Sequence, residues 1–377
     1  MHLIDIRAHR RFARPLAAAL LLAAVLIAPA GVQAAATAPE TLARTASVGE
    51  RPVAPAMRID FLGVHWRGAA GAAGTVRLRR DGRWGRWRAL HRGDIRPAGR
   101  FASELLAAHG ATAYDVRAPE GARDVRAVAI NATDGPRRAL DRHGAAGDRS
   151  ARAATAAKPL ARLCLHDRAA WGADESLRFD AAGNELWPPA FFAVRRLTVH
   201  HTATESGGSD PAAVVRAIYR YHAVDLGFGD IGYQLLIDHR GCIYEGRTSG
   251  ADGVPVFQGV AGAGAAPLAV NGGHVVGFNA GNVGVALIGE FTDMEPSRPA
   301  LLSLTRTLAV LAAATRLDPL ATGTYVNPIT GATLQTATIS GHRDWLATEC
   351  PGTRLYALLP ALRRRVAALV ALQRGGA

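Results

Sequence analysis

The spacing of apolar residues divides the chain into two regions with different periods. From about residue 56 to residue 134, short runs alternate between apolar and polar positions, as in RIDFLGVHW at 58–66 and ARDVRAVAI at 122–130. Glycine and Asp-Gly turns separate these runs, which is typical of short strands in an all-β fold. The pattern therefore predicts a small all-β accessory domain over 56–134.

The second region, 161–372, interleaves strand patterns with helical ones. The predicted elements are a strand at 195–204, a helix at 210–227, a hairpin at 231–247, a strand at 283–291, a helix at 300–317, a hairpin at 323–341 and a helix at 354–372. Asp210 and Pro211 form a helix-start signal, and Pro360 is expected to kink or split the last helix. Such interleaving predicts an α/β domain with a mostly mixed central sheet flanked by helices.

The segments outside these regions have simpler compositions. Residues 1–34 combine an arginine-rich start, an apolar stretch and small residues at a cleavage site, which predicts an export signal that is removed. Residues 35–55 and 135–160 are rich in small and polar residues and are predicted to be linkers. No later segment is long and apolar enough to cross a membrane. We therefore expect a secreted protein.

Positive charge is concentrated in the first part of the chain. The formal net charge is +13, and residues 1–150 carry 24 arginines against 13 acidic residues, whereas residues 151–377 carry 20 basic against 18 acidic residues. A basic surface suits nucleic acid, anionic lipid or an anionic cell wall, and it can also be an ordinary solvated surface. In the basic stretch 77–91, Trp84 and Trp87 indicate either a stacking edge for sugars or polyanions or a hairpin whose tryptophans pack inward.

The chain has three cysteines, Cys164, Cys242 and Cys350. In the oxidising setting that export implies, two of them can pair and one is left over. An odd cysteine in an exported protein is a free thiol, an intermolecular link or a ligand for something bound.

Two histidines and a cysteine of the second region form a candidate metal site. His342 and Cys350 flank a short polar loop, and His200 and His201 end a predicted strand. Neighbouring residues on a strand point to opposite faces, so only one histidine of the pair can face a metal. A thiolate and two imidazoles suit a tetrahedral zinc whose fourth position is open to water.

The segments around these residues resemble the zinc-dependent N-acetylmuramoyl-L-alanine amidases, the family that includes the peptidoglycan recognition proteins and phage T7 lysozyme. The resemblance rests on five blocks in order, namely RAAWGADES, VHHTAT, YRYHAVDLGFGDIGYQLLIDHRGCIYEGR, GFNAGNVGVALIGEF and ISGHRDWLATECPG, which span about 165–356. The all-β domain is similar, more loosely, to an accessory domain found ahead of such amidases in high-GC Gram-positive bacteria. The resemblance implies a peptidoglycan recognition protein-like α/β fold for 161–372.

The resemblance also assigns roles to individual residues. It makes His200, His342 and Cys350 the ligands of Zn²⁺, and it places Tyr233 beside the metal. Thr348 stands where related proteins carry lysine or threonine, so that Tyr233 and Thr348 become candidate donors to the oxyanion that forms during catalysis. Cytosolic members carry a glutamate where this chain has Ala286, so the chain is similar to the branch that carries the tyrosine.

The implied activity is hydrolysis of the amide between the lactyl group of muramic acid and L-alanine, by a water that zinc activates. The implied partners are peptidoglycan and muropeptides, with anionic cell-wall polymers as a further partner of the basic β domain, and not nucleic acid. We expect a monomer that associates with the cell wall.

Four further residues are candidates for substrate contacts, each with a structural alternative. His222 is either a contact for glycan or peptide or a surface or half-buried helix histidine. Arg247 and Arg343 either pair with peptide carboxylates or form structural ion pairs. Asn282 either contacts the ligand or orders a turn.

With Cys350 assigned to the metal, the resemblance leaves Cys164 and Cys242 as a disulfide that joins the start of the domain to its hairpin. The alternative is two buried free thiols.

Two other functions are compatible with parts of the pattern. A peptidoglycan-binding protein without catalysis would typically lack a zinc ligand, most often the cysteine, whereas this chain keeps all three. A zinc peptidase would usually show a helical H-E-x-x-H motif, which is absent from the sequence.

Overall fold

The computed structural model describes residues 37–68, 74–93, 99–140, 163–250, 254–259 and 265–375. The predicted export signal and most of the predicted linker 135–160 lie outside these residues. The described residues all belong to one compact unit, Ala36–Ala377. Within the described ranges, no helix combines the length and apolar character that crossing a bilayer requires.

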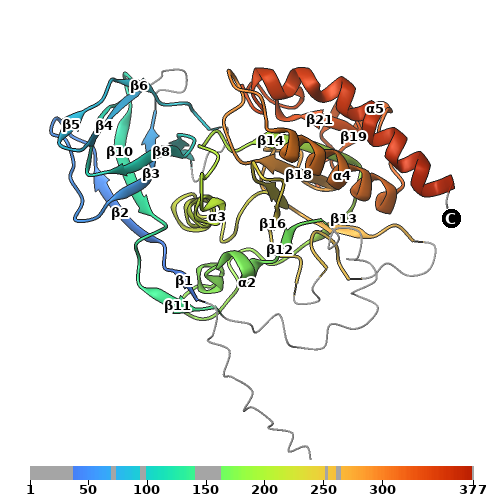
Figure 1. Ribbon diagram of the computed structural model, residues 1–377, viewed down its shortest axis with the longest axis horizontal. Helices are drawn as coiled ribbons and strands as arrows, with labels where there is room; N and C mark the ends of the chain where they lie inside the picture. Colours follow the sequence, from blue (N-terminus) through green and yellow to red (C-terminus); the bar gives the residue numbers. More distant parts are fainter. Residues whose placement is uncertain are drawn as a thin grey trace, which may run out of the picture. The chain divides into compact units, whose positions relative to one another are not determined.

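Three antiparallel sheets form the N-terminal region, strands β1 to β11, which we call the β module (Figure 1): two larger sheets and the separate pair β1–β11. The larger sheet contains β2 (Leu42–Ser47), β10 (Arg123–Asn131), β3 (Ile59–Arg67), β7 (Phe101–Ala102) and β8 (Leu106–Ala111). The smaller sheet contains β5 (Arg83–Trp84), β4 (Thr75–Arg80), β6 (Arg88–Ala89) and β9 (Ala113–Arg117). Apolar side chains of both sheets, among them Leu62, Val64 and Leu78, form a shared core. The predicted all-β region is confirmed.

The prediction that 35–55 is a linker was wrong. Strand β1 (Thr37–Pro39) pairs with β11 (Arg137–Ala139), and β2 pairs with β10 along its whole length. The residues of β2 are half-buried or exposed, and they show no apolar period. Backbone hydrogen bonds hold an edge strand of this kind, and they do not depend on a side-chain pattern.

The C-terminal region contains a six-stranded mixed sheet. Its strand order is β12 (Leu165–His166), β16 (Ile243–Glu245), β15 (Leu235–Ile237), β18 (Asn282–Leu287), β14 (Arg196–His201) and β21 (Ile339–Gly341). The β15–β18, β18–β14 and β14–β21 pairs are parallel, whereas β15 and β16 form the predicted antiparallel hairpin. The α/β fold class is confirmed.

The remaining elements lie around this sheet. They are α2 (Arg168–Trp171), the 3₁₀ turn η2 (Glu175–Arg178), α3 (Pro211–Arg220), the π-helical turn η3 (Tyr221–Asp225), the pair β13 (Phe191–Ala193) and β17 (Leu268–Val270), α4 (Arg298–Thr315), the hairpin β19 (Thr322–Val326) and β20 (Thr333–Ala337), the 3₁₀ turn η4 (His342–Asp344) and α5 (Thr353–Gly375). The predicted split at Pro360 does not occur, and α5 continues as one helix through that residue.

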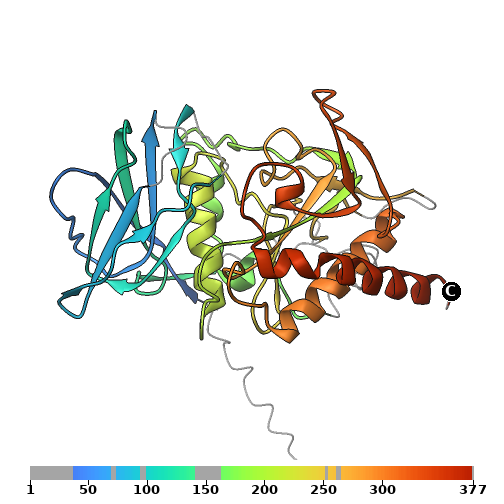
Figure 2. The same cartoon turned by 90° about the horizontal axis from the view of Figure 1, so that it is seen from above.

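The two faces of the C-terminal sheet are covered by different partners. Helices α4 and α5 pack on one face through a core that includes Leu197, Val199 and Val285. Helix α3 packs on the other face, and its far side lies against the β module, so that one apolar cluster runs through all three layers (Figure 2). The β module is therefore built onto the α/β domain.

Strand β3 explains how the β module and α3 fit together. Phe61 belongs to the cluster with α3, whereas Leu62 and Val64 point into the core of the β module, which is why β3 is buried on both faces. A side chain at Gly63 would meet the ring of Tyr221, 2.3 Å from an ideal Cβ. Tyr221 also donates a hydrogen bond to the Ser103 carbonyl at 2.8 Å. Glycine at 63 thus permits the close approach that joins the two layers.

The tryptophans of the basic hairpin are half-buried and lie outside the core of the β module. The Arg77 guanidinium carbon lies 4.9 Å from the ring centre of Trp84 and 4.7 Å from that of Trp87, and Arg117 lies 4.1 Å from Trp87. Inward packing, one of the two sequence interpretations, is therefore wrong, and the rings form cation–π contacts with arginines at the surface.

Candidate metal centre

The candidate site lies where parallel strands of the C-terminal sheet end. Strands β14 and β21 run parallel, and their carboxyl ends carry His200 and His342 respectively. Neighbouring parallel strands place their carboxyl ends at the same edge of a sheet, which is the usual location of sites in α/β folds. Cys350 comes from the loop between η4 and α5 and reaches the same place.

The structure brings the three predicted ligands together. One possible ligand atom from each of His200, His342 and Cys350 lies within 4.8 Å of the others, and all three residues are buried. His200 Nδ1 lies 3.6 Å from Cys350 Sγ. Zinc bonds of about 2.0–2.1 Å to nitrogen and about 2.3 Å to sulfur, at a tetrahedral angle, separate the two ligand atoms by about 3.5 Å. The residues therefore fit a tetrahedral zinc ion.

The adjacent histidines His200 and His201 have different roles, as strand alternation requires. The ring of His200 lies on the α3 side, beside the ring of His342 at a centroid distance of 4.5 Å. The His201 ring lies near Phe291, whose backbone amide donates to its Nδ1 at 3.3 Å. The backbone amide of His201 approaches Cys350 Sγ at 3.4 Å. A donor at this position favours the thiolate form, which is the form that binds metal.

Burial keeps the candidate imidazole ligands neutral. Desolvation, together with the neighbouring histidines, lowers the pKa of His342 to about 3 and that of His200 well below its usual value of 6.5. A neutral imidazole has a lone pair available for a metal, whereas a protonated one has none. The site is thus prepared for metal binding at neutral pH.

The metal cluster borders a small cavity of about 70 Å³. Its lining includes His342, Cys350, Tyr233 and His222 of the α/β domain, together with Ser103, Glu104 and Leu105 of the β module. The β module is thus part of the wall of the candidate site.

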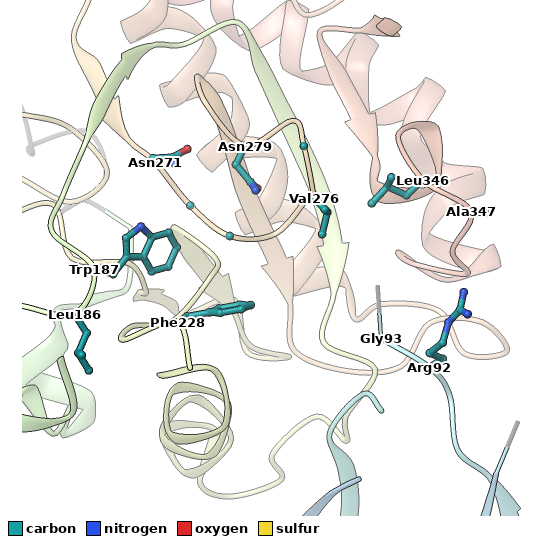
Figure 3. A pocket seen from close by; sticks show the side chains of 13 residues that line it. Arg92, Gly93, Leu186, Trp187, Phe228, Asn271, Val276, Asn279, Leu346 and Ala347 are labelled. Atoms are coloured by element: carbon teal, nitrogen blue, oxygen red, sulfur yellow. The ribbon is translucent and has the colours of Figure 1, made fainter. Parts of the chain in front are cut away.

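A larger groove of about 710 Å³ extends nearby, and the two cavities share Gly93 and Gly273 in their linings. Figure 3 shows Trp187 and Phe228 together in this groove, and Arg92 near Leu346 at another part of it. The rings of Trp187 and Phe228 meet edge to face at 6.1 Å between centroids. The groove therefore combines aromatic rings with an arginine of the β module.

The two predicted oxyanion donors occupy different positions. Tyr233 lies in the cavity wall, with its ring centre 5.3 Å from that of His200 and 5.6 Å from that of His222. Thr348 Oγ1 accepts a hydrogen bond from the Cys350 amide at 3.2 Å, so the threonine orders the loop that carries the sulfur. The catalytic roles of both residues stay predictions.

His222 is buried in the wall of the cavity. Its Nδ1 accepts a hydrogen bond from the Gly232 amide at 3.1 Å, and burial lowers its pKa to about 4. The neutral ring therefore carries its proton on Nε2 as a donor. Its predicted contact with substrate stays a prediction, but it is a fully enclosed histidine and not a half-buried one.

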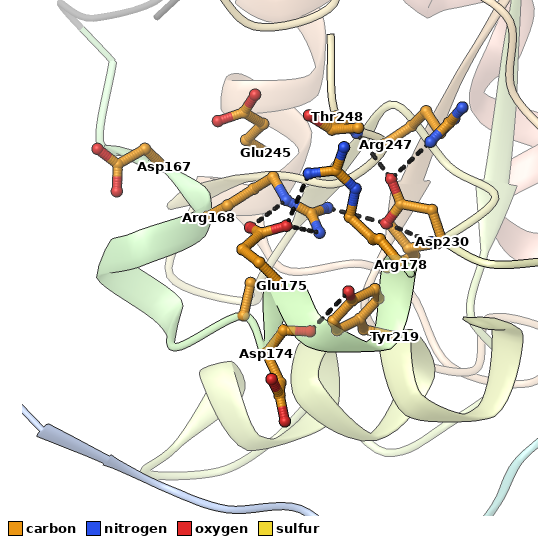
Figure 4. A network of polar contacts seen from close by, with 12 residues as sticks. Asp167, Arg168, Asp174, Glu175, Arg178, Tyr219, Asp230, Glu245, Arg247 and Thr248 are labelled. Atoms are coloured by element: carbon orange, nitrogen blue, oxygen red, sulfur yellow. Dashed lines mark hydrogen bonds and ion pairs between the residues drawn. The ribbon is translucent and has the colours of Figure 1, made fainter. Parts of the chain in front are cut away.

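The predicted substrate contact of Arg247 is contradicted by its environment. The guanidinium is fully buried and donates to Asp230 at 2.8 Å and to the carbonyls of Trp187 and Asn271. Asp230 also binds Arg168, as Figure 4 shows. The guanidinium is fully buried among these protein partners and lines neither cavity, so the structural ion-pair alternative holds. Arg247 instead holds Trp187 against the groove, 4.0 Å from the ring centre.

Asn282 and Arg343 also have structural partners. Asn282 is buried, accepts from Thr198 at 2.8 Å and donates to the Phe278 carbonyl, which corresponds to the ordered-turn alternative. Arg343 donates to the Glu349 carbonyl and stacks 4.8 Å from the ring centre of Tyr356, so it braces the cysteine loop. Neither residue lines the two cavities described above.

The sequence interpretation missed His274, which is buried and lies 2.9 Å from His200, nitrogen to nitrogen. One signal could have found it, namely Gly284 in the interior of a predicted strand. Glycine inside a strand indicates a close approach, and a Cβ at Gly284 would lie 2.6 Å from the His274 ring.

Comparison with known proteins agrees with this site. Residues 191–353 match the family model described as N-acetylmuramoyl-L-alanine amidase (Amidase_2). The human N-acetylmuramoyl-L-alanine amidase is 30% identical over 202 residues, which are 52% of this chain and 27% of that protein. Peptidoglycan-recognition protein SA of Drosophila melanogaster is 34% identical over 110 residues, 29% of this chain and 45% of that protein.

The matches thus span about a quarter of the human protein and less than half of the fly protein. Among solved structures, wild-type Drosophila PGRP-LB is 25% identical, with a TM-score of 0.37, over 52% of this chain and 92% of that one. Residues 191–353 thus match the N-acetylmuramoyl-L-alanine amidase (Amidase_2) family, as the sequence motifs indicated.

Proposed function

We propose that the protein is an exported zinc amidase that hydrolyses the amide bond between N-acetylmuramic acid and L-alanine in peptidoglycan. The single observation that carries the proposal is the buried set of two imidazoles and one thiol at the carboxyl edge of the sheet. His342 and Cys350 of this set line a cavity whose wall also includes Tyr233. The family match supports the choice of the bond that is cut.

The chemistry of the donor atoms favours zinc. Imidazole nitrogen and thiolate sulfur are preferred by zinc, whereas Mg²⁺ and Ca²⁺ take oxygen ligands. Three protein ligands are the usual number at a catalytic zinc, since the fourth position is left for water or substrate. His200, His342 and Cys350 would hold the ion.

The protein's own residues would orient the substrate and stabilise the charge that develops. When bound, zinc lowers the pKa of a coordinated water to about 7 and polarises a carbonyl oxygen. The Tyr233 hydroxyl would donate a hydrogen bond to that oxygen as it gains negative charge, and Thr348 would be a second donor. Trp187 and Phe228 offer apolar faces to a sugar ring or a peptide in the groove.

Export to an oxidising compartment is supported by the disulfide. Cys164 and Cys242 are joined with an S–S distance of 2.04 Å, so the predicted pair forms in the structure. Structural disulfides persist outside the cytosol and are rare inside it. An exported enzyme would meet peptidoglycan directly.

The test is digestion of purified peptidoglycan by the full chain, followed by identification of the products. We expect stem peptides with a free N-terminal alanine, lost when a chelator removes zinc and restored when zinc is added back. Cleavage at another bond, or activity that resists chelation after zinc removal has been verified, would contradict the proposal.

The same digest separates catalysis from recognition, the alternative function within the family. The zinc-loaded protein is incubated with insoluble peptidoglycan, and both sedimentation with the wall and release of peptides are measured. Binding without release would identify a recognition protein and not an amidase.

The basic β module is proposed to bind anionic wall polymers. Arg117, which is exposed and stacks on the Trp87 ring, supports this proposal, because a salt-sensitive polyanion contact needs exposed cations. Wall binding should weaken as salt rises, and this dependence on salt should be smaller in Arg117→Ala than in the unmodified chain. Binding that is independent of salt would contradict this role.

A further inference from the structure

A chain of polar contacts leads from the backbone to the candidate metal ligand His200. His274 Nε2 lies 3.0 Å from the Asn282 carbonyl oxygen, and His274 Nδ1 lies 2.9 Å from His200 Nε2. On the other side of its ring, His200 Nδ1 lies 3.6 Å from Cys350 Sγ. These three contacts form a continuous chain from the backbone of strand β18, through the rings of His274 and His200, to the metal cluster.

The carbonyl at the start of this chain determines where each proton lies. A backbone carbonyl only accepts hydrogen bonds, so His274 Nε2 must carry the proton. In the neutral ring Nδ1 is then an acceptor, and the partner nitrogen, His200 Nε2, must be the donor. The proton of neutral His200 is therefore on Nε2, which leaves the lone pair of Nδ1 directed at the cluster.

The fold holds His274 firmly in this orientation. The residue is buried, and Gly272 and Gly284 leave the space for its ring, since ideal Cβ atoms there would lie 2.9 and 2.6 Å from ring carbons. The Asn279 side chain accepts a hydrogen bond from the His274 amide at 2.9 Å. The rings of His200 and His274 meet edge to face, 4.9 Å apart.

We propose that His274 is a positioning residue of the metal centre, which selects the tautomer and the orientation in which His200 binds the metal through Nδ1. The proposal rests on the proposed metal site, but it does not depend on which bond the enzyme cuts. Partners of this kind around metal-binding histidines typically contribute a factor of about 10–100 in metal affinity.

The first experiment determines the tautomers directly. The full chain is labelled with ¹⁵N and prepared without metal, and long-range ¹H–¹⁵N spectra report which ring nitrogen of each histidine carries hydrogen. We expect protonated Nε2 in both His200 and His274, and on addition of zinc a shift of the His200 Nδ1 signal. A proton on His200 Nδ1 in the metal-free protein would overturn the proposal.

The second experiment measures metal binding in variants. His274→Phe keeps a ring but removes both nitrogens, whereas His274→Gln keeps one acceptor and one donor. We expect zinc affinity, measured by competition with a chelator, to fall about 10–100-fold in His274→Phe and to recover at least partly in His274→Gln. The visible spectrum of bound Co²⁺ should change in His274→Phe, because the ligand geometry relaxes.

A matched control isolates the effect of burying a phenyl ring. His65 is also a buried histidine, but it lies in the β module next to Tyr221. We expect His65→Phe to retain the zinc affinity and the Co²⁺ spectrum of the unmodified chain. The positioning role would be refuted if folded His274→Phe bound zinc with an affinity within about twofold of that of the unmodified chain and showed an unchanged Co²⁺ spectrum.

If His274→Phe does not fold, the tautomer measurement on the unmodified chain decides alone. These outcomes are separate from the peptidoglycan digest: a protein that binds zinc through His200 Nδ1 but releases no stem peptide would retain the positioning role and lose only the proposed activity.

Discussion

Two places in the α/β domain bring histidine and cysteine together within the same short distance, yet they differ in chemistry. Cys164, His166 and Cys242 form one group, and His200, His342 and Cys350 form the other, and in each the possible ligand atoms lie within 4.8 Å of one another. In the first group the sulfurs are joined as a disulfide, and the residues are exposed or half-buried. In the second all three residues are buried and the cysteine is not in a disulfide.

The difference shows that residue type and proximity do not by themselves make a metal site. Two sulfurs that meet in an oxidising compartment form a bond, and neither is then a thiolate. Cys350 is the odd cysteine, so its sulfur remains available for a metal. The second group also lies at the carboxyl ends of parallel strands, beside a cavity, whereas the first lies at the β12–β16 edge of the sheet.

Replacement of cysteine by serine should have the largest effect in the second group and a very different effect in the first. We expect Cys350→Ser to lose stoichiometric zinc and to lower activity more than about 100-fold, beyond the typical cost of removing a supporting partner, because a serine hydroxyl stays protonated at neutral pH. The double variant Cys164→Ser, Cys242→Ser should keep both zinc and activity. Metal analysis and the peptidoglycan digest measure the two properties, and zinc loss from the double variant would contradict the assignment.

Acid should destabilise the metal-free protein through its buried histidines. Burial lowers the pKa of six histidines: to about 4 for His65, His201, His222 and His274, to about 3 for His342, and well below its usual value for His200. Between the lowered pKa values of the folded protein and the pKa of about 6.5 in the unfolded chain, the unfolded chain binds more protons than the folded protein does. The free energy of unfolding therefore falls as pH falls through this range.

Two carboxyls oppose this trend, because burial raises the pKa of Asp225 to about 6 and that of Glu245 to about 7. The net difference near pH 5.5 is about four protons, which corresponds to roughly 5 kcal/mol per pH unit. Urea unfolding of the metal-free chain at several pH values measures the slope. A free energy of unfolding that stays constant from pH 7 to pH 5 would show that these histidines are not neutral in the folded protein, and His65→Phe should reduce the slope by about one proton.

Removal of the disulfide in the first group should lower the free energy of unfolding without affecting zinc binding by the second group. The disulfide spans 78 residues, and constraining a loop of that length in the unfolded chain contributes about 4 kcal/mol in the chain-entropy model. We expect the double serine variant to show this loss in urea unfolding with zinc bound in both proteins. A stability equal to that of the unmodified chain would mean that the bridge adds no constraint.

Each group also has a tyrosine ring beside its histidine, which allows a matched pair of substitutions. Tyr233 lies 5.3 Å from His200, and Tyr244 lies 5.0 Å from His166, centroid to centroid. We expect Tyr233→Phe to lower kcat about 100-fold, the usual effect of losing one donor to an oxyanion, with zinc content unchanged. Tyr244→Phe should leave kcat unchanged, and equal kcat values in the two variants would argue against a catalytic role for Tyr233.

The smallest expected effect concerns the contact between Tyr221 and the β module, which lies beside the cavity of the second group. Tyr221→Phe removes the buried hydrogen bond to the Ser103 carbonyl and should lower the free energy of unfolding by about 1–2 kcal/mol. Zinc affinity should be unchanged, because the hydroxyl lies in the layer between α3 and the β module. Hydrogen exchange of Tyr221→Phe and of the unmodified chain measures where the stability is lost. A change in exchange that is equal throughout α3 and the β module would contradict a local effect at their contact.

Much of the fold was predictable because local patterns carry it. The predicted helix at 300–317 corresponds to α4, and the hairpin at 231–247 to β15 and β16. The predicted helix at 210–227 begins at Pro211 as expected, but its last turn is π-helical from Tyr221 to Asp225. The missed strands β1 and β2 have small or polar residues without an apolar period, and only their pairing partners make them strands.

The candidate site was predictable in its donors but not in its surroundings. Arginine at 247 is equally compatible with a ligand contact and with a buried ion pair until Asp230 and its full burial are known. His274 has no pattern of its own, and its partner His200 is 74 residues away. Contacts between distant segments depend on how the layers pack, which local periodicity does not encode.

The sequence by itself determined which side chains could bind a metal, that one histidine of the pair at 200–201 must face away, and that three cysteines cannot all pair with one another within the chain. These conclusions follow from strand alternation and from the odd number of cysteines. Only the tertiary structure decided that Cys350 reaches His200 across 150 residues, that His274 orients the ring, and that the β module lines the cavity. The physical reason is that these contacts exist only where parallel strands end together and α3 packs between two sheets, which is a property of the assembled layers.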